Sequence, residues 1–432
     1  PNKGYVISSM LSVLLLSLSP YSMAMVTWKD NIPSALAPFQ NNPQQLAGLV
    51  QDNILIYGHP AVKTTVPTQV TNPVPTANFT TAAIIVPVAA ADVAKTLGNY
   101  SQYVGLFPTL KSAKILEHAN NISQVKYKVS IPTPIKVLNF NEDVTLQHQL
   151  GNNSLATLII DAPIPFAVSK FEWFNLGNNR TLITLTHWGD LNQPKGFLFK
   201  KILNALPEAK LGIPSGTGAF VMEALKNRFS AKKVTALAAG QLPSPIFNAA
   251  QINKIAQLSQ NSGQSVSVVL NPATVPYTHG AEALRFTTTY QYLNRTPQQL
   301  QSWTTPQSYQ QLFPNQIKEI KTTPLTAQGL DAAFKVSVGL GVINIPFNFK
   351  MHFSYPKVTE NNFYANGGDV RYLKGNMQFN PLGNVTLLKM TTAMKIDDQA
   401  PFLLRAMRSL PYHEMLPAVG GNAVFTQKIK AR

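Results

Sequence analysis

The chain contains an internal repeat, and this repeat constrains the fold more than any other feature of the sequence. Residues 100–115 read Tyr-Ser-Gln-Tyr-Val-Gly-Leu-Phe-Pro-Thr-Leu-Lys-Ser-Ala-Lys-Ile, and residues 308–320 return as Ser-Tyr-Gln-Gln-Leu-Phe-Pro-Asn-Gln-Ile-Lys-Glu-Ile. The offset from Phe107 to Phe313 is 313 − 107 = 206, and from Gly177 to Gly383 it is 383 − 177 = 206. Two separate pairs of matching residues with the same offset predict a tandem duplication. A unit of roughly 200 residues is an ordinary domain length.

Composition narrows the class of protein and excludes several chemistries. Of the 432 residues 45% are hydrophobic and 13% are charged, which is typical of a globular protein. Cysteine is absent, which excludes disulfides, cysteine-ligated metals, a thiol nucleophile and a lipobox-type lipid anchor. The net charge of +17 favours an anionic partner, such as a phospholipid surface, although solubility explains the excess equally well. No basic arm or aromatic-interleaved motif accompanies the charge, so no nucleic-acid partner is expected.

The first 24 residues have the pattern of a cleavable signal peptide. Lys3 precedes the apolar run 6–18, and Ser22-Met23-Ala24 provides a small-x-small ending. We therefore expect export with cleavage after Ala24, and the periplasm as the compartment. Secretion is the alternative, as is retention on a membrane through an uncleaved N-terminal segment.

Each repeat unit predicts the same order of elements. In the first unit an edge strand at 81–88 is followed by short helices at 90–97 and 100–107 and by an antiparallel meander. The six strands of the meander are predicted at 112–117, 124–131, 137–147, 154–161, 168–174 and 180–186. Helical patterns at 194–206 and 215–229 close the unit, and the Gly/Pro-rich stretch 212–216 predicts a break with a new helix start capped by Ser215 or Thr217.

The duplication includes a leader before each unit. A helical pattern at 43–50 and an apolar strand at 53–57 precede the first unit, and 250–259 and 265–270 mirror them before the second. We predict a signal peptide at 1–24, a first domain with its leader at 25–230, and a second domain with its leader at 231–432.

This order predicts an α+β fold of two tandem helix-grip domains, each a curved antiparallel sheet wrapped on a long C-terminal helix. Residues 99–108, followed by 111–116, resemble the second-helix-to-strand segment of the START-like (SRPBCC) superfamily of polyketide cyclase, coenzyme-Q-binding and lipid-transfer proteins, and 212–226 resemble its last helix. The resemblance covers 81–229 and, more faintly, 284–432. A common tryptophan after the second helix is absent from both units, and the leaders are additional. The resemblance implies that an apolar small molecule or lipid binds between sheet and last helix, although some members of the superfamily are empty structural domains.

The sequence offers little sign of catalytic chemistry. None of the seven histidines has metal-ligand spacing, and no nucleophile elbow, P-loop or dinucleotide fingerprint occurs, so we predict no metal, no cofactor and no catalytic residue. Glu142 and Asp143 are neighbours in a strand and point to opposite faces. His187 ends the last strand of the first unit, where a pocket mouth would lie, but an ordinary strand-end imidazole is the favoured interpretation. The residues predicted to line a ligand, with plain core packing as the alternative, are Trp173, Phe199, Leu203, Phe220, Leu403, Met407 and Phe425.

The leading hypothesis is an exported, non-enzymatic binding or carrier protein for a hydrophobic small molecule or lipid, with docking on an anionic membrane as a further expectation. The alternative is a structural subunit of a cell-envelope assembly, built from pocketless helix-grip domains and bound to an envelope protein partner. The third hypothesis is a cyclase- or hydrolase-like enzyme. That hypothesis requires convergent polar groups at the cavity floor and a perturbed pKa among them.

Overall fold

The computed structural model of the chain describes residues 24–69, 74–277, 280–326 and 329–432. All of the predicted signal peptide except Ala24 lies outside the described residues. Within them, no helix combines the length and the apolarity that a membrane span needs.

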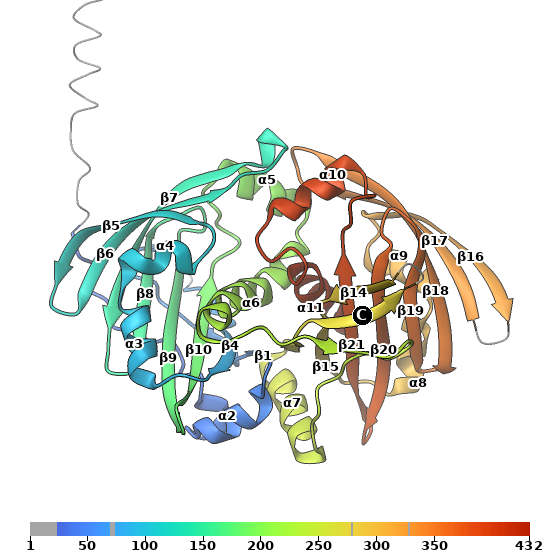
Figure 1. Ribbon diagram of the computed structural model, residues 1–432, viewed down its shortest axis with the longest axis horizontal. Coiled ribbons are helices and arrows are strands. Elements are labelled where there is room, and N and C mark those ends of the chain that lie inside the picture. Colours follow the sequence, from blue (N-terminus) through green and yellow to red (C-terminus); the bar gives the residue numbers. More distant parts are fainter. Residues whose placement is uncertain (1–23, 70–73, 278–279, 327–328) are drawn as a thin grey trace, which may run out of the picture.

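A single antiparallel sheet of sixteen strands organises the molecule. Its order is β16-β17-β18-β19-β20-β21-β15-β12-β1-β4-β10-β9-β8-β7-β6-β5, so each half repeats the other outward from the central pair β12 and β1. We call the elements from α2 to α6 (residues 43–229) unit 1 and those from α7 to α11 (residues 249–430) unit 2. In Figure 1 the outer strands of the two units curve away from the centre as two wings. The tandem duplication is confirmed by this repeated order.

The strands have the following bounds. Those of unit 1 are β1 (Ile54–Gly58), β4 (Thr80–Val86), β5 (Leu110–Ala119), β6 (Ile122–Ile131), β7 (Phe140–Leu150), β8 (Ser154–Asp161), β9 (Ala167–Gly177) and β10 (Arg180–Gly189). Those of unit 2 are β12 (Val266–Val269), β15 (Thr287–Leu293), β16 (Ile317–Thr326), β17 (Gly329–Gly339), β18 (Asn344–Lys357), β19 (Glu360–Gly368), β20 (Tyr372–Leu382) and β21 (Val385–Lys395). Two small sheets join β2 (Val62–Lys63) with β3 (Thr76–Ala77), and β11 (Thr235–Ala236) with β13 (Ala273–Tyr277) and β14 (Gly280–Leu284).

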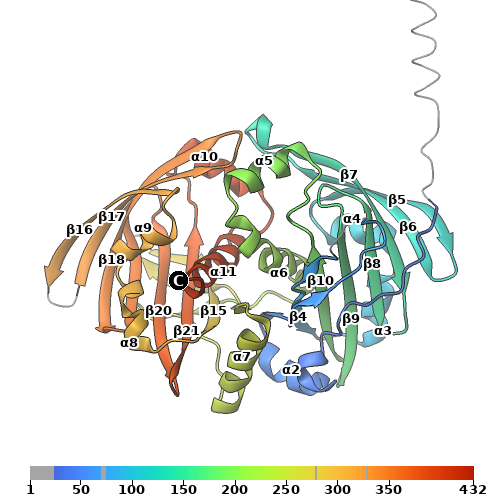
Figure 2. The same cartoon turned by 180° about the vertical axis from the view of Figure 1, so that it is seen from behind.

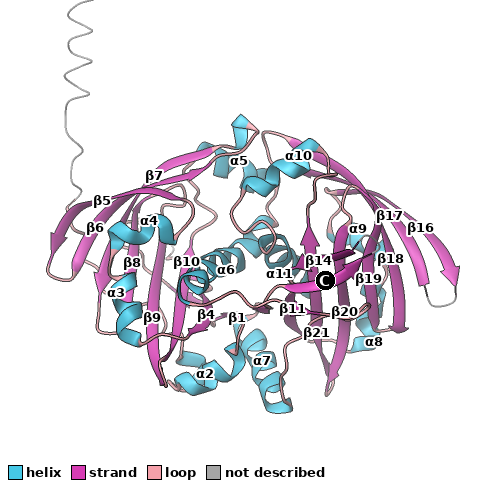
Figure 3. Cartoon of the chain, viewed as in Figure 1, coloured by secondary structure: helices cyan, strands magenta, loops and turns pink. Residues whose placement is uncertain are grey.

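The helices also occur in equivalent pairs. Unit 1 contains α2 (Pro43–Val50), α3 (Ala90–Leu97), α4 (Tyr103–Leu106), α5 (Phe197–Ala205) and α6 (Ala209–Phe229). Unit 2 contains α7 (Ala249–Ser262), α8 (Pro297–Leu300), α9 (Tyr309–Leu312), α10 (Phe402–Arg405) and α11 (Leu416–Lys430). Single 3-10 turns lie at 37–39, 100–102, 136–138, 301–304, 306–308 and 406–409. Figure 3 shows α6 and α11 between the two wings, and Figure 2 shows α2 and α7 together below the central strands. The α+β class and the helix-grip arrangement are therefore confirmed.

The central strands are covered on both faces, which explains why their sequences are continuously apolar. Ile54 and Ile56 belong to the core that also contains α6, whereas Leu55 and Tyr57 belong to the core formed with α2 and α7. Successive side chains of a strand point to opposite faces, so a strand between two helical layers needs apolar residues at every position. The prediction that 81–88 forms an edge strand was wrong, because β4 lies between β1 and β10. The leader strand β1 pairs with β4 and covers the edge.

The predicted helix break at 212–216 was also wrong. Helix α6 runs from Ala209 to Phe229 through Pro214, and Thr217 donates its hydroxyl to the Ile213 carbonyl, 2.8 Å away, instead of capping a new helix. Pro214 is the sixth residue of α6, beyond the first four amides that lack a partner in a helix, so the helix continues although Pro214 cannot donate to the carbonyl of Lys210. Gly212 allows close packing at this point: a Cβ on it would lie 2.8 Å from the Gly420 carbonyl oxygen of α11.

The two units share a buried ion pair, in addition to the continuous sheet and the contact between helices α6 and α11. Glu223 of α6 pairs with Arg285, which precedes β15, and the two side chains are only 8% and 10% exposed. Arg285 also donates to the carbonyl of Leu270. The units are therefore joined through backbone, apolar and ionic contacts, while the predicted domain boundary at residue 230 stays a prediction.

Candidate functional site

Unit 1 encloses a cavity between its sheet and α6. The cavity has a volume of about 1160 Å³, which is above the ~300–1,000 Å³ usual for small-molecule sites. Most of its lining comes from unit 1, from the inner face of β6 to β10, from α5 and α6 and from the segment around α4, and unit 2 adds residues 262–265, Gln427 and Lys430. Most lining side chains are apolar, among them Phe107, Val129, Val144, Leu146, Ile159, Phe171, Leu185 and Phe220.

Three polar side chains on neighbouring strands interrupt this apolar lining. The Tyr127 hydroxyl lies 2.8 Å from Nε2 of His148, and Nδ1 of His148 lies 2.7 Å from the Thr157 hydroxyl. The strand register explains part of the grouping, because His148 of β7 pairs directly with Thr157 of β8. Tyr127 of β6 pairs with Val144, on the same face of β7 as His148, and its hydroxyl reaches along that face to the imidazole. We call Tyr127, His148 and Thr157 the polar floor. All three line the cavity and are buried.

Aromatic rings hold the polar floor in place. Tyr100 stacks on the His148 ring with centroids 4.4 Å apart, and Tyr103 stacks on Tyr127 at 6.0 Å. The Tyr103 hydroxyl is occupied, since it donates to the Leu97 carbonyl at 2.5 Å. Burial lowers the pKa of His148 to about 3 and raises the pKa of Tyr127. The floor is therefore uncharged at neutral pH.

Helix α5 lies at the rim of the cavity. Phe199 lines the cavity and meets Phe140 edge-on at 5.5 Å, whereas Phe197 is 71% exposed on the same helix. His187 and Trp188, at the end of β10, also line the cavity. Burial lowers the pKa of His187 to about 4, so this imidazole is also neutral at pH 7. His187 therefore lines the cavity, and the favoured interpretation of it as an ordinary strand-end imidazole stays a prediction.

Unit 2 fills the equivalent space with phenylalanine. Strand pairing places Phe334 where unit 1 has Tyr127, Phe353 where it has His148, and Phe363 where it has Thr157. These three rings are buried, with exposed fractions of 4%, 0% and 7%, and they belong to one core cluster. Phe349, equivalent to Val144, stacks on Phe334 at 5.0 Å. The two units thus share a fold but not an interior.

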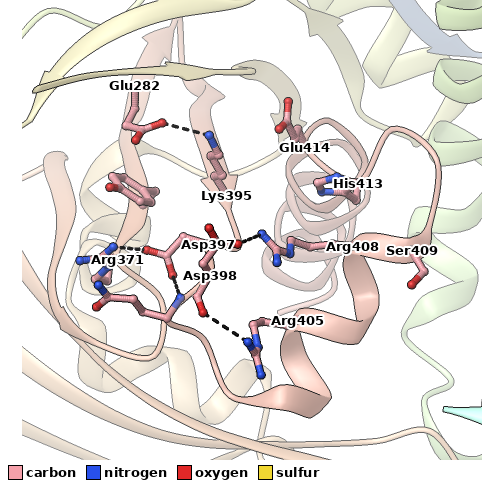
Figure 4. Close-up of a pocket in the computed structure, with 12 residues that line it drawn as sticks. Glu282, Arg371, Lys395, Asp397, Asp398, Arg405, Arg408, Ser409, His413 and Glu414 are labelled. Atoms are coloured by element: carbon pink, nitrogen blue, oxygen red, sulfur yellow. Dashed lines mark hydrogen bonds and ion pairs between the residues drawn. The ribbon is translucent and has the colours of Figure 1, made fainter. Parts of the chain in front are cut away.

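A second, charged cavity of about 740 Å³ lies in unit 2 where the sheet meets α10 (Figure 4). Its four basic side chains and four acidic ones balance, and most are paired with one another. Lys395 pairs with Glu282 at 3.0 Å, and Arg408 with Asp398 at 2.8 Å. Arg371 pairs with Asp397 at 2.5 Å. The network fastens α10 and the following turn to the ends of β20 and β21, and its charges are largely neutralised within it.

Comparison with known proteins gives only distant likenesses. No family model matches the sequence, and no curated protein matches it. The di-domain ARO/CYC StfQ from the steffimycin biosynthetic pathway matches with a TM-score of 0.25 and 6% identity, over 80% of this chain and 96% of that one. A START superfamily protein from Mycobacterium smegmatis matches with a TM-score of 0.27 and 17% identity, over 35% of this chain and 96% of that one. A STAR-related lipid transfer protein from Xanthomonas axonopodis matches with a TM-score of 0.28 and 14% identity, over 41% of this chain and 93% of that one.

Likenesses of this degree carry no argument about function, and we base the fold on the strand order and helix packing of this chain. Each unit wraps eight strands around a closing helix: six meander strands, the strand that precedes them (β4 or β15) and the leader strand. The fold is a tandem of two helix-grip units.

The cavity of unit 1 includes two of the predicted ligand-lining residues. Phe199 and Phe220 line it, whereas Trp173 and Leu203 are buried elsewhere, at 3% and 2% exposure. In unit 2, Leu403 and Met407 pack against the core around Leu404. Phe425 meets Tyr309 edge-on at 5.1 Å. Contact with a ligand stays a prediction for all seven residues.

The sequence analysis did not predict the polar floor of unit 1. His148 was weighed only as a metal ligand, and it has no metal-ligand spacing. The signal that could have identified it is the inward row of β7, in which His148 follows Val144 and Leu146 at alternate positions. Among the described residues, no group of three histidine, aspartate or glutamate side chains is arranged to hold a metal ion.

Proposed function

We propose that this protein binds or carries a hydrophobic small molecule or lipid in the cavity of unit 1, without changing it chemically. The observation that carries the proposal is the 1160 Å³ apolar cavity between the curved sheet and α6. Burial of apolar ligand surface there would contribute about 25 cal/mol per Å² before the costs of association. We propose a supporting role for unit 2, because buried phenylalanines occupy the equivalent positions.

The experiment exchanges interior residues between the units. Val144→Phe with Thr157→Phe gives unit 1 two of the rings of unit 2. We expect the purified protein to carry an apolar molecule, detected by native mass spectrometry and solvent extraction, and this variant to lose it. The reverse exchange in unit 2, Phe349→Val with Phe363→Thr, is the matched control and should retain the ligand. An empty wild-type protein that also binds no added apolar probe would refute the proposal.

We also propose export and docking on an anionic membrane. Export is supported by the signal-peptide pattern of residues 1–24. Docking is supported by Phe197 and Phe402, which begin the equivalent helices α5 and α10 and are 71% and 55% exposed. The two helices lie side by side in both Figure 1 and Figure 2, and Lys200 and Lys201 follow Phe197 on α5. An apolar tip flanked by basic residues suits a negatively charged lipid surface.

Vesicle sedimentation tests the docking. Phe197→Ser with Phe402→Ser should weaken binding to vesicles containing phosphatidylglycerol at least tenfold, because burying one phenylalanine is worth about 1.5–3 kcal/mol. The control is Ile246→Ser, which removes an apolar side chain that is 85% exposed outside these helices. Equal binding by both variants would refute a docking role for α5 and α10.

A second candidate function is acid–base catalysis in the same cavity. The polar floor meets the requirement set by the sequence analysis, because polar groups converge on the cavity and burial lowers the pKa of His148. A carrier and its Tyr127→Phe variant should contain molecules of the same mass. If the variant accumulated a molecule of a different mass from that in the wild type, the catalytic candidate would replace the carrier.

A further inference from the structure

The polar floor has one hydrogen-bonding proton more than it uses internally. With His148 neutral, the Tyr127 hydroxyl, the imidazole and the Thr157 hydroxyl supply three protons, and the two hydrogen bonds among them use two. If His148 is protonated on Nε2, the spare proton lies on Tyr127; if it is protonated on Nδ1, the spare proton lies on Thr157. In the first tautomer Tyr127 can donate to a ligand, and in the second it can accept from one.

None of the charged side chains in the lining belongs to the strands that carry the polar floor. They are Asp190 after β10, Lys210 of α6 and Lys430 of α11, and each has a neutral hydrogen-bond partner. Asp190 accepts from the Gln69 amide at 2.8 Å, and Lys210 donates to Asn192 at 3.0 Å. Lys430 donates to the carbonyl of Gly263. A ligand charge placed against the floor would lose its hydration without gaining an opposite charge, which costs several kcal/mol.

We infer that the ligand is a long apolar molecule with one uncharged hydroxyl or carbonyl group, and that this group is buried against Tyr127, His148 and Thr157. The apolar remainder extends along the lining toward Phe199 of α5. The inference rests on the proposed carrier function and adds the chemical class and orientation of the ligand. A hydroxyl fits the floor as well as a carbonyl does, because the tautomer of His148 selects whether Tyr127 donates or accepts.

The experiment compares ten-carbon probes that differ only at one end. Decane, decan-1-ol, decanoate and decylammonium compete at pH 8 with the uncharged fluorophore N-phenyl-1-naphthylamine for the full chain. We expect decan-1-ol to bind about fivefold more tightly than decane, since one neutral hydrogen bond contributes ~1 kcal/mol, and both ions to bind more weakly than the alcohol.

Two variants locate the effect. Tyr127→Phe should abolish the difference between decan-1-ol and decane and leave the affinity for decane unchanged. The control Tyr57→Phe removes another buried tyrosine hydroxyl, which donates to the Ala35 carbonyl in the core formed with α2 and α7, so it should keep the wild-type ranking. Equal affinities for alcohol and alkane, tighter binding of either ion, or an unchanged ranking in Tyr127→Phe would overturn the inference while the carrier function stands. Failure of the fluorophore and all four probes to bind would instead refute the carrier function.

Discussion

Replacing His148 with phenylalanine should change how the stability of the protein depends on pH. The side chain is 2% exposed, and burial lowers its pKa to about 3, against about 6.5 in an unfolded chain. Between these two values the unfolded state binds a proton that the folded state does not. The free energy of unfolding therefore falls as the pH falls below about 6.5, by ~1.4 kcal/mol per pH unit.

The magnitude follows from this slope. Between pH 7.5 and pH 5 the wild type loses ~2 kcal/mol through His148, which is 1.5 units below 6.5 multiplied by ~1.4 kcal/mol. His148→Phe removes this loss. At pH 7.5 the variant is expected to be less stable, because leaving the Tyr127 and Thr157 hydroxyls without their partner costs roughly 1–3 kcal/mol each where no water replaces it.

Urea unfolding at the two pH values measures the effect. The stability of the variant relative to the wild type should improve by ~2 kcal/mol on moving from pH 7.5 to pH 5. The pKa values of His59 and His187 are also lowered by burial, but both residues are present in both proteins and their contributions cancel. The control His118→Gln removes an exposed histidine of β5 and should leave the pH dependence as it is. If the free energy of unfolding fell by the same amount between pH 7.5 and pH 5 in His148→Phe and in the wild type, His148 would not be a buried neutral imidazole.

Two further predictions concern the joint between the units. Gly212→Ala should destabilise the fold by about 1–3 kcal/mol, because its Cβ would lie 2.8 Å from the Gly420 carbonyl oxygen, whereas Gly216→Ala on the same helix meets nothing within 4 Å and should stabilise it by up to ~1 kcal/mol. Thermal and urea unfolding compare the two, and equal effects would contradict the close helix crossing. Glu223→Gln should cost about 3–5 kcal/mol by leaving Arg285 buried without its counter-ion, and Glu223→Leu with Arg285→Met should recover most of that loss. A double variant as unstable as the single one would show that the pair contributes more than mutual neutralisation.

The duplication, the order of the elements and the class of fold could be predicted from the residues alone. These properties are local, because turn residues, apolar periodicity and proline act within a few positions of the chain. The helix predicted at 43–50 and the strand at 154–161 have the same bounds in the structure. The leader strands could be located, but their pairing across the centre of the molecule could not, because hydrogen bonds between β1 and β12 join residues more than two hundred positions apart.

Which unit contains the apolar cavity, and where its polar groups meet, depends on packing across the whole molecule. Tyr127, His148 and Thr157 lie on three strands, and only the strand register brings them to one cavity. Nor could a local pattern show that α6 continues through Pro214, since the packing of Gly212 against α11 supports that helix from outside. The sequence predicts which residues belong to one strand or one helix. Whether residues of different strands meet at one cavity depends on how the sheet curves, which is a property of all its strands together.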